Sequence, residues 1–180
     1  MSRTIFARAV IAAALALPIA SCATLQDPAA KATPDQKAIS RGTAAWNQKS
    51  PPAAKPFWME IKDKTARTTY TGYVDTFDSG SRYLAEAQSA KAGDDARILA
   101  SYERAQNAFS ALPADLELPE ETRTSGIAVA AGRMRSLIAA DKLPRARELG
   151  QAAVRTFGKS DAIASMTAEI DAITASRKRE

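Results

Sequence analysis

Apolar side chains in residues 94–176 recur at steps of three and four positions, the spacing that places side chains on one face of an α-helix. Four such stripes follow one another along the chain. They consist of Ile98, Leu99, Tyr102, Ala105, Phe109 and Leu112; of Ile127, Ala130, Ala131, Met134, Leu137 and Ile138; of Ala146, Leu149, Ala153, Val154 and Phe157; and of Ile163, Met166, Ile170 and Ile173. Each stripe is too narrow for its helix to be stable alone in water. The short connections therefore predict helices that pack antiparallel to their neighbours.

The residues between the stripes predict where these helices begin and end. Acidic pairs at 94–95 and 120–121 suit the amino-terminal ends of two helices, because carboxylates interact favourably with the positive end of the helix dipole. Pro113 closes the first helix, and Pro144 suits the first turn of the third. Gly158 is expected to end that third helix.

Residues 57–92 allow two interpretations. The segment TTYTGYV is rich in β-branched and aromatic residues, which favour a strand, but no second strand is available to pair with it. We therefore favour a helix, broken at Ser79 and Gly80 and followed by a second helix that runs up to Gly93. The apolar face of the first helix would consist of Ala66, Tyr70, Tyr73, Val74 and Phe77. The fold class is accordingly all-α, made of antiparallel helical hairpins in a bundle or in an array.

The amino terminus has a different pattern. Two arginines precede an uncharged apolar run, residues 9–19, and small residues then lead into the only cysteine of the chain, Cys22. A basic head, a short apolar run and a small-residue cleavage site are typical of an export signal. The run is too short to cross a bilayer, which needs about 20 apolar residues. We interpret residues 1–21 as a signal peptide that is removed.

The sequence Ile19-Ala20-Ser21-Cys22 resembles the lipobox of bacterial lipoproteins, which has an aliphatic residue, two small residues and a cysteine. The resemblance implies cleavage before Cys22, attachment of lipid to its sulfur and acylation of the new amino terminus. Several acyl chains hold a protein to a membrane far better than one chain does. The next two residues lack the aspartate that the family associates with inner-membrane retention, so the resemblance implies the outer membrane, facing the periplasm. An ordinary secretory signal cut nearby is the alternative.

Residues 22–56 are rich in proline, alanine and polar residues, the composition of an extended, semi-rigid spacer. A helix in its middle is opposed by Gly42 and by the lack of a broad apolar stripe. We therefore predict a lipid-anchored linker over 22–56, a helical domain over 57–176 and a basic tail over 177–180.

Aromatic residues crowd the amino-terminal half of the chain, and most are expected to pack against the helices. Trp46 and Trp58 lie beside proline-rich segments, where we expect them to be exposed. Because tryptophan offers a large contact area with a polar tip, these two side chains are candidate anchors for a partner protein.

The segment AAGRMRSLIAADKLPRARELGQAAVRTFGKSDAIA resembles a tetratricopeptide repeat. Ala146 and Ala153 are spaced like the small residues of that repeat's second helix, whereas Met134 stands where the family has a small residue. A poorer match includes Ala105, which lies 48 positions before Ala153, farther than the family's period of about 34 residues. The resemblance implies repeat-like hairpins over 93–176 that bind peptides or partner domains, and a generic helix bundle is the alternative.

Candidate catalytic chemistry is sparse. The sequence contains no histidine, which is the commonest general base and transition-metal ligand, and its one cysteine is expected to be acylated. The acidic pairs fall at predicted helix starts or on an exposed face, where carboxylates are solvated rather than paired across a cleft. Solvated charge is also expected of four arginines around a predicted turn: Arg133, Arg135, Arg145 and Arg147. We predict no enzyme activity, no metal site and no cofactor.

The net charge is +5, and removal of the leader with its two arginines lowers it to +3, which is too mild to indicate nucleic-acid binding. We expect a lipid-anchored, non-catalytic protein-binding or scaffold module, held to the membrane through Cys22 and contacting another envelope protein. A structural spacer without a specific ligand is the alternative. A carboxylate-dependent cell-wall enzyme is less favoured.

Overall fold

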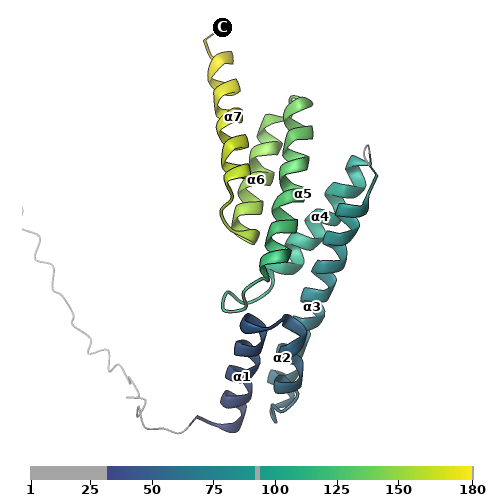
Figure 1. The fold of residues 1–180 in the computed structure, drawn as a ribbon, viewed down its shortest axis with the longest axis vertical. Helices are drawn as coiled ribbons and strands as arrows, with labels where there is room; N and C mark the ends of the chain where they lie inside the picture. The colour runs from purple at the N-terminus through teal and green to yellow at the C-terminus, as the bar shows by residue number, and fades with distance from the viewer. Residues whose placement is uncertain (1–31, 92–93, 180) are drawn as a thin grey trace, which may run out of the picture. The chain divides into compact units, whose positions relative to one another are not determined.

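In the computed structural model, the described residues, 32–91 and 94–179, form seven helices and no strand (Figure 1). The helices are α1 Pro34–Gln48, α2 Pro51–Trp58, α3 Lys64–Ser89, α4 Asp95–Ser110, α5 Glu120–Ala139, α6 Leu143–Phe157 and α7 Asp161–Arg177. The all-α prediction is therefore confirmed. None of these helices is both long enough and apolar enough to cross a membrane.

The helices pair in chain order. The closest packing is between α1 and α2, between α3 and α4, and between α5 and α6, so that successive helices form hairpins (Figure 1). The hairpins then stack, because α3 and α4 both contact α5, and α4 also contacts α6. Helix α2 joins the first hairpin to α3, and α7 packs against α5 and α6. Each narrow apolar stripe is thereby covered by neighbouring helices.

A glycine and an aromatic ring meet between the two helices of each hairpin. In all three hairpins, the glycine lies on the first helix and the ring comes from the last turn of the second helix. The ring atoms lie less than 3.0 Å from the point that a Cβ atom on the glycine would occupy. The pairs are Gly42 with Trp58, Gly80 with Phe109, and Gly126 with Phe157. The missing side chain lets the two helices approach closely while a large ring fills the space between them.

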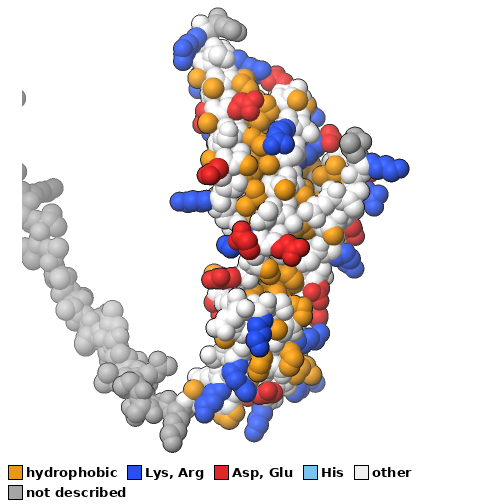
Figure 2. Space-filling model, viewed as in Figure 1, with side chains coloured by type: hydrophobic (Ala, Val, Ile, Leu, Met, Phe, Trp, Pro, Cys, Tyr) orange, Lys and Arg blue, Asp and Glu red, His pale blue; other side chains and the backbone are white. Residues whose placement is uncertain are grey.

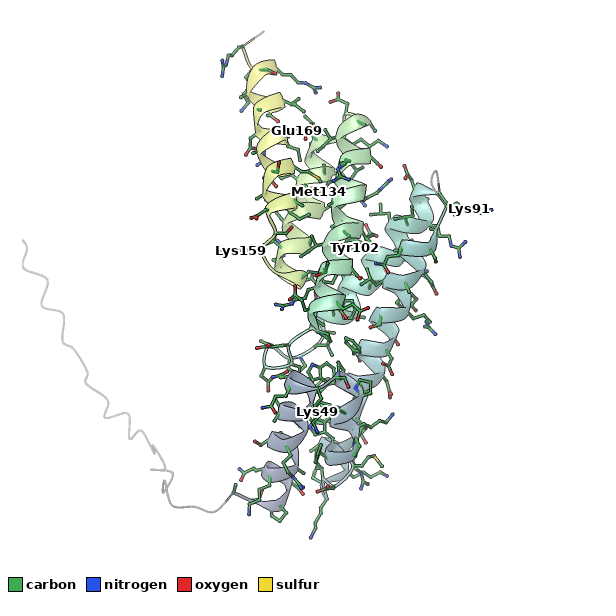
Figure 3. All side chains as sticks on the ribbon, viewed as in Figure 1. Lys49, Lys91, Tyr102, Met134, Lys159 and Glu169 are labelled. Atoms are coloured by element: carbon green, nitrogen blue, oxygen red, sulfur yellow. The ribbon has the colours of Figure 1, made fainter. Side chains whose placement is uncertain are left out.

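Met134 has the opposite arrangement. It is fully buried on α5. Its Cε atom lies 2.9 Å from the point that a Cβ atom on Gly150 of α6 would occupy. Figure 3 shows Met134 in the interior between the helices. The large residue is therefore accommodated by a glycine on the facing helix.

The rings of the core form a continuous chain through the stacked hairpins. Neighbouring ring centroids are 5.4 to 6.4 Å apart, within the range of favourable aromatic contacts. In order of contact, the rings are Tyr70, Tyr73, Trp58, Trp46, Phe77, Phe109, Phe157 and Tyr102. Aromatic packing thus connects α1, α2 and α3 to α4 and α6.

The predicted linker over 22–56 is wrong from Pro34 onward, because this segment forms α1 and most of α2. Thr33 and Gln36 form a reciprocal capping box at the start of α1, and Pro51 occupies the first turn of α2. The buried face of α1 consists of small residues and one tryptophan, so it lacks the aliphatic stripe that marks the later helices. The helical unit therefore begins at α1 rather than at residue 57.

The predicted break at Ser79 and Gly80 is also wrong, because α3 continues through both residues to Ser89. The Ser79 hydroxyl donates to the Asp75 carbonyl, 2.8 Å away, as it does within helices. The helix continues through Gly80, and the Phe109 ring packs into the space that a side chain at this position would fill. The helical interpretation of the segment TTYTGYV, which we favoured over a strand, is confirmed.

The segment 111–119 fastens α1 to the rest of the helical unit. The Trp46 indole Nε1 donates to the Glu117 carbonyl at 2.8 Å. The Asn47 side chain donates to the Asp115 carbonyl at 2.9 Å and accepts from the Glu117 amide at 3.0 Å. Leu116, within the same segment, is buried. The proline-containing connection before α5 is therefore a structural clasp.

Asp141 lies just after the carboxyl-terminal end of α5. Its φ is 59°, the left-handed conformation that glycine adopts most readily. The Lys142 amide donates to the Leu137 carbonyl at 2.8 Å, which completes this helix ending. The Asp141 carboxylate also accepts two hydrogen bonds from Arg177, at 2.6 and 3.1 Å. Arg177 is the last residue of α7, so the predicted basic tail over 177–180 is wrong at this residue.

Candidate functional site

The structure does not support the two tryptophans as partner anchors. Trp46 is 2% exposed and Trp58 is fully buried. Their indole nitrogens donate within the protein, that of Trp46 to Glu117 and that of Trp58 to the Ile39 carbonyl at 3.3 Å. The expectation that they are exposed is wrong, because residues 34–58 fold into the core. Cys22 and the lipobox lie outside the described residues.

The acidic residues singled out in the sequence lie on or at the start of three separate helices. The acidic pairs 94–95 and 120–121 lie at the starts of α4 and α5, and Glu169 and Asp171 are exposed on α7 (Glu169 is labelled in Figure 3). Among the described residues, histidine, cysteine, aspartate and glutamate form no group of three that could hold a metal ion.

Three of the four arginines form ion pairs between helices. Arg145 pairs with Glu103 at 3.1 Å, and Arg147 pairs with Asp171. Arg133 differs from the others because its side chain is only 12% exposed, and its ion pair with Asp95, at 2.6 Å, joins α5 to the start of α4. The expectation of solvated charge fits Arg135, which is exposed. It does not fit Arg133, whose ion pair holds two helices together. Figure 2 shows both signs of charge interspersed over the face in view.

The pKa shifts in the described residues have structural causes. Burial raises the pKa of the Tyr102 hydroxyl, which lies in the interior (Figure 3), and also that of Tyr70. The amides of Lys62 and Asp63 donate to Asp35 and lower the pKa of its carboxyl group. Hydrogen bonding from Arg177 lowers the pKa of Asp141. These groups lie apart, at a ring packing site, a helix start and a helix end.

A hollow of about 750 Å³ lies where α4 and α6 end, beside the clasp segment 111–119 and the first turn of α5. We call it the α4–α6 hollow. Its apolar lining consists of Phe109, Leu112, Leu116, Leu118 and Phe157, together with alanine and proline side chains. Leu112 and Leu118 are only partly buried, so the hollow presents apolar surface to solvent. The size is that of a ligand-binding cleft.

Polar groups surround the apolar lining. The hydroxyls of Ser110 and Thr156 lie 3.2 Å apart across the α4–α6 contact. Arg123 pairs with Glu120, whereas exposed Arg155 forms no ion pair with any described residue. Glu117 is the one acidic residue that lines the hollow.

Gln106 is the exceptional polar residue of this site. It is 8% exposed, and its buried amide nitrogen Nε2 has no hydrogen-bond partner among the described residues. An unpartnered buried amide is costly, about 1–3 kcal/mol, so such groups call for an explanation. Gln106 lines the α4–α6 hollow and also a smaller hollow of about 180 Å³ between α4 and α6. Gln106 therefore forms part of the wall of both hollows.

Among the described residues that line the hollow, no nucleophile is hydrogen-bonded to a general base. Apolar surface, an unpartnered amide donor and an arginine suit a molecule that has an apolar group and a hydrogen-bond acceptor. Gln106 was missed in the sequence because no motif marks it. The available signal was a polar residue next to Ala105 in an otherwise apolar helical stripe.

No family model matches this chain, and neither a curated protein nor a solved structure does so.

Proposed function

We propose that the protein is a lipid-anchored, non-catalytic protein-binding module of the bacterial cell envelope. It is held through Cys22 to the outer membrane and faces the periplasm. The lipobox resemblance supports the anchor. The single observation that supports binding is the α4–α6 hollow, which combines exposed apolar surface with the unpartnered amide of Gln106.

The stacking of hairpins supports a distant tetratricopeptide-like arrangement over 93–176. The hairpins α3–α4 and α5–α6 contact each other through both of their helices, so a surface extends across these two hairpins. Met134, the departure from the family pattern, is matched by the absence of a side chain at Gly150. We infer that the exchange of a large and a small residue preserves the close approach of α5 and α6.

The anchor is tested by labelling cells with a radioactive fatty acid and separating membranes from soluble protein. We expect wild-type protein to be labelled and sedimented, and Cys22→Ala to be unlabelled and released from membranes. Ser21→Ala is the matched control, because it keeps the cysteine and a small residue before it. Label that persists in Cys22→Ala would show that the sulfur of Cys22 is not the attachment point.

Binding is tested with a photo-activated cross-linking residue placed in the full-length, membrane-bound protein. At exposed Asn107, on the rim of the α4–α6 hollow, we expect a cross-link to a second envelope protein. At exposed Gln88 on α3, outside the hollow, we expect none. If neither position gives a product while the anchor is intact, the spacer interpretation replaces the binding module.

A further inference from the structure

We propose that the α4–α6 hollow binds an extended peptide segment in which a carboxylate residue is next to a large apolar residue. The proposal rests on the proposed function and adds the chemical class of the ligand. It concerns a segment of a partner polypeptide, since the hollow offers both apolar contact and hydrogen-bond donors.

The apolar half of the ligand follows from the lining. Phe109 and Phe157 are buried at 4% and 2% exposure, and their rings contact each other with centroids 5.8 Å apart. Leu112 and Leu118 remain partly exposed at the same site. A leucine or phenylalanine side chain placed on this surface removes apolar area from water, and complete burial of such a side chain is worth about 1.5–3 kcal/mol.

The acceptor half follows from the unmatched donors. The Gln106 amide nitrogen is buried without a partner, and Arg155 lines the same hollow without an ion pair to any described residue. Both groups donate hydrogen bonds, and the guanidinium of arginine matches the geometry of a carboxylate. Glu117 is the only acidic residue in the lining, and Arg123, which also lines the hollow, is paired with Glu120. Arg155, which has no ion pair with a described residue, therefore favours aspartate or glutamate over asparagine or glutamine.

The size of the hollow selects this site over its neighbour. The smaller hollow that Gln106 also lines has about 180 Å³, which is less than the 300–1,000 Å³ typical of ligand sites. Arg145 lines that smaller hollow and already pairs with Glu103. Each hollow thus has one α6 arginine in its lining, paired with Glu103 in the smaller hollow and without an ion pair to a described residue in the larger, which gives two variants to compare.

The proposal is tested by fluorescence anisotropy with the purified full chain and a fluorescein-labelled heptapeptide, Gly-Ser-Asp-Leu-Phe-Asp-Gly. A second peptide has asparagine in place of both aspartates. We expect the acidic peptide to bind roughly tenfold more tightly than the amide peptide, because arginine forms a stronger hydrogen bond with a carboxylate than with a neutral amide. A tenfold difference in affinity corresponds to about 1.4 kcal/mol. Equal affinity for the two peptides would overturn the carboxylate assignment.

Two variants locate the peptide in the hollow. Arg155→Gln is expected to weaken binding of the acidic peptide roughly tenfold and to abolish the preference over the amide peptide. Gln106→Leu, which removes the unpartnered amide at similar volume, is expected to weaken both peptides by a similar factor, roughly fivefold. Arg145→Gln removes the same charge from the same helix and is expected to change neither affinity. Thermal melts of all three variants confirm that they are folded.

The outcomes separate this proposal from the broader one. If Arg145→Gln weakens binding as much as Arg155→Gln, the peptide does not occupy the α4–α6 hollow, and the proposal fails. If neither peptide binds at protein concentrations up to about 1 mM, the ligand class is wrong. A cross-link from Asn107 in membranes would then still support the protein-binding module, whereas its absence would remove both.

Discussion

Gly126→Ala tests whether contact between a glycine and an aromatic ring sets the distance between the helices of a hairpin. A Cβ atom at Gly126 would lie 2.5 to 2.6 Å from three atoms of the Phe157 ring. Ordinary van der Waals contact begins at about 3.4 Å. The Phe157 ring is 2% exposed and lies against the rings of Tyr102 and Phe109, so a shift of the ring would disturb both of these contacts.

The expected magnitude combines two opposing effects. Alanine in place of glycine inside a helix stabilises by about 1 kcal/mol, since glycine loses more conformational freedom on folding. Overpacking a filled core costs about 1–3 kcal/mol, and the approach of three ring atoms to within 2.6 Å places Gly126→Ala at the upper end. The net result is destabilisation by about 2 kcal/mol.

Gly132→Ala is the matched control on the same helix. A Cβ atom at Gly132 would have no neighbour within 4 Å, so only the gain in helix propensity remains. We expect Gly132→Ala to stabilise by about 1 kcal/mol, and the two variants to differ by about 3 kcal/mol. For a chain of this size, 1 kcal/mol corresponds to a change of about 2–4 °C in Tm.

The assay is urea unfolding followed by circular dichroism, with the free energy taken at constant m value. A double variant, Gly126→Ala with Phe157→Leu, measures the coupling between the two positions. Because leucine is smaller than the ring, we expect Gly126→Ala to cost less in this background than in the wild type. If Gly126→Ala is as stable as Gly132→Ala, or if the two changes are simply additive, the ring does not limit the approach of the helices.

The remaining predictions concern other contacts of the helical unit. In α3, Gly80→Ala is expected to lower the Tm because the new Cβ would lie 2.6 Å from the Phe109 ring, whereas Gly72→Ala, with no neighbour within 4 Å, is expected to raise it by about 2–4 °C; equal shifts would contradict the packing described for this hairpin. Trp46→Phe removes the indole donor to the clasp and part of a buried ring, so urea unfolding is expected to show a loss of about 2–3 kcal/mol, and an unchanged midpoint would mean that the clasp contributes nothing to stability. Arg177 lowers the pKa of Asp141 below its ordinary value of 3.8, so this carboxylate stabilises the fold above about pH 4 and the stabilisation is lost as the pH falls through the lower folded-state pKa. The urea midpoint of Asp141→Asn is therefore expected to fall less between pH 5 and pH 2 than that of the wild type, and parallel curves would contradict this.

The helices from α4 to α7 could be predicted from the sequence because their stripes contain large aliphatic and aromatic residues at helical spacing. The helix ends near Pro113 and Gly158, and the helix starts at the acidic pairs, are local properties, since capping and helix-breaking residues act within one turn. The start of α5 at Glu120 and the end of α6 at Phe157 agree with these signals. Local chemistry was sufficient in this part of the chain.

Tertiary contacts decided the fold of residues 34–58 and the continuity of α3. Glycine by itself weakens a helix, so Gly42 and Gly80 predict against one in the sequence. In the structure, rings from the partner helices occupy the space beside both glycines, and the buried area of the rings outweighs the loss in propensity. Sequence alone does not show which ring will face which glycine.

The candidate site was likewise determined only by the tertiary structure. The lipobox at Cys22 is a linear motif, so the sequence by itself was enough to predict the anchor. The α4–α6 hollow draws Gln106 from one helix, Leu116 from the clasp and Arg155 from another helix, residues that are far apart in the chain. A cavity exists only once these elements are packed, and a buried amide lacks a partner only when its surroundings are fixed. Spacing along the sequence therefore predicted the helices, while the stacking of hairpins created the surface proposed to bind a partner.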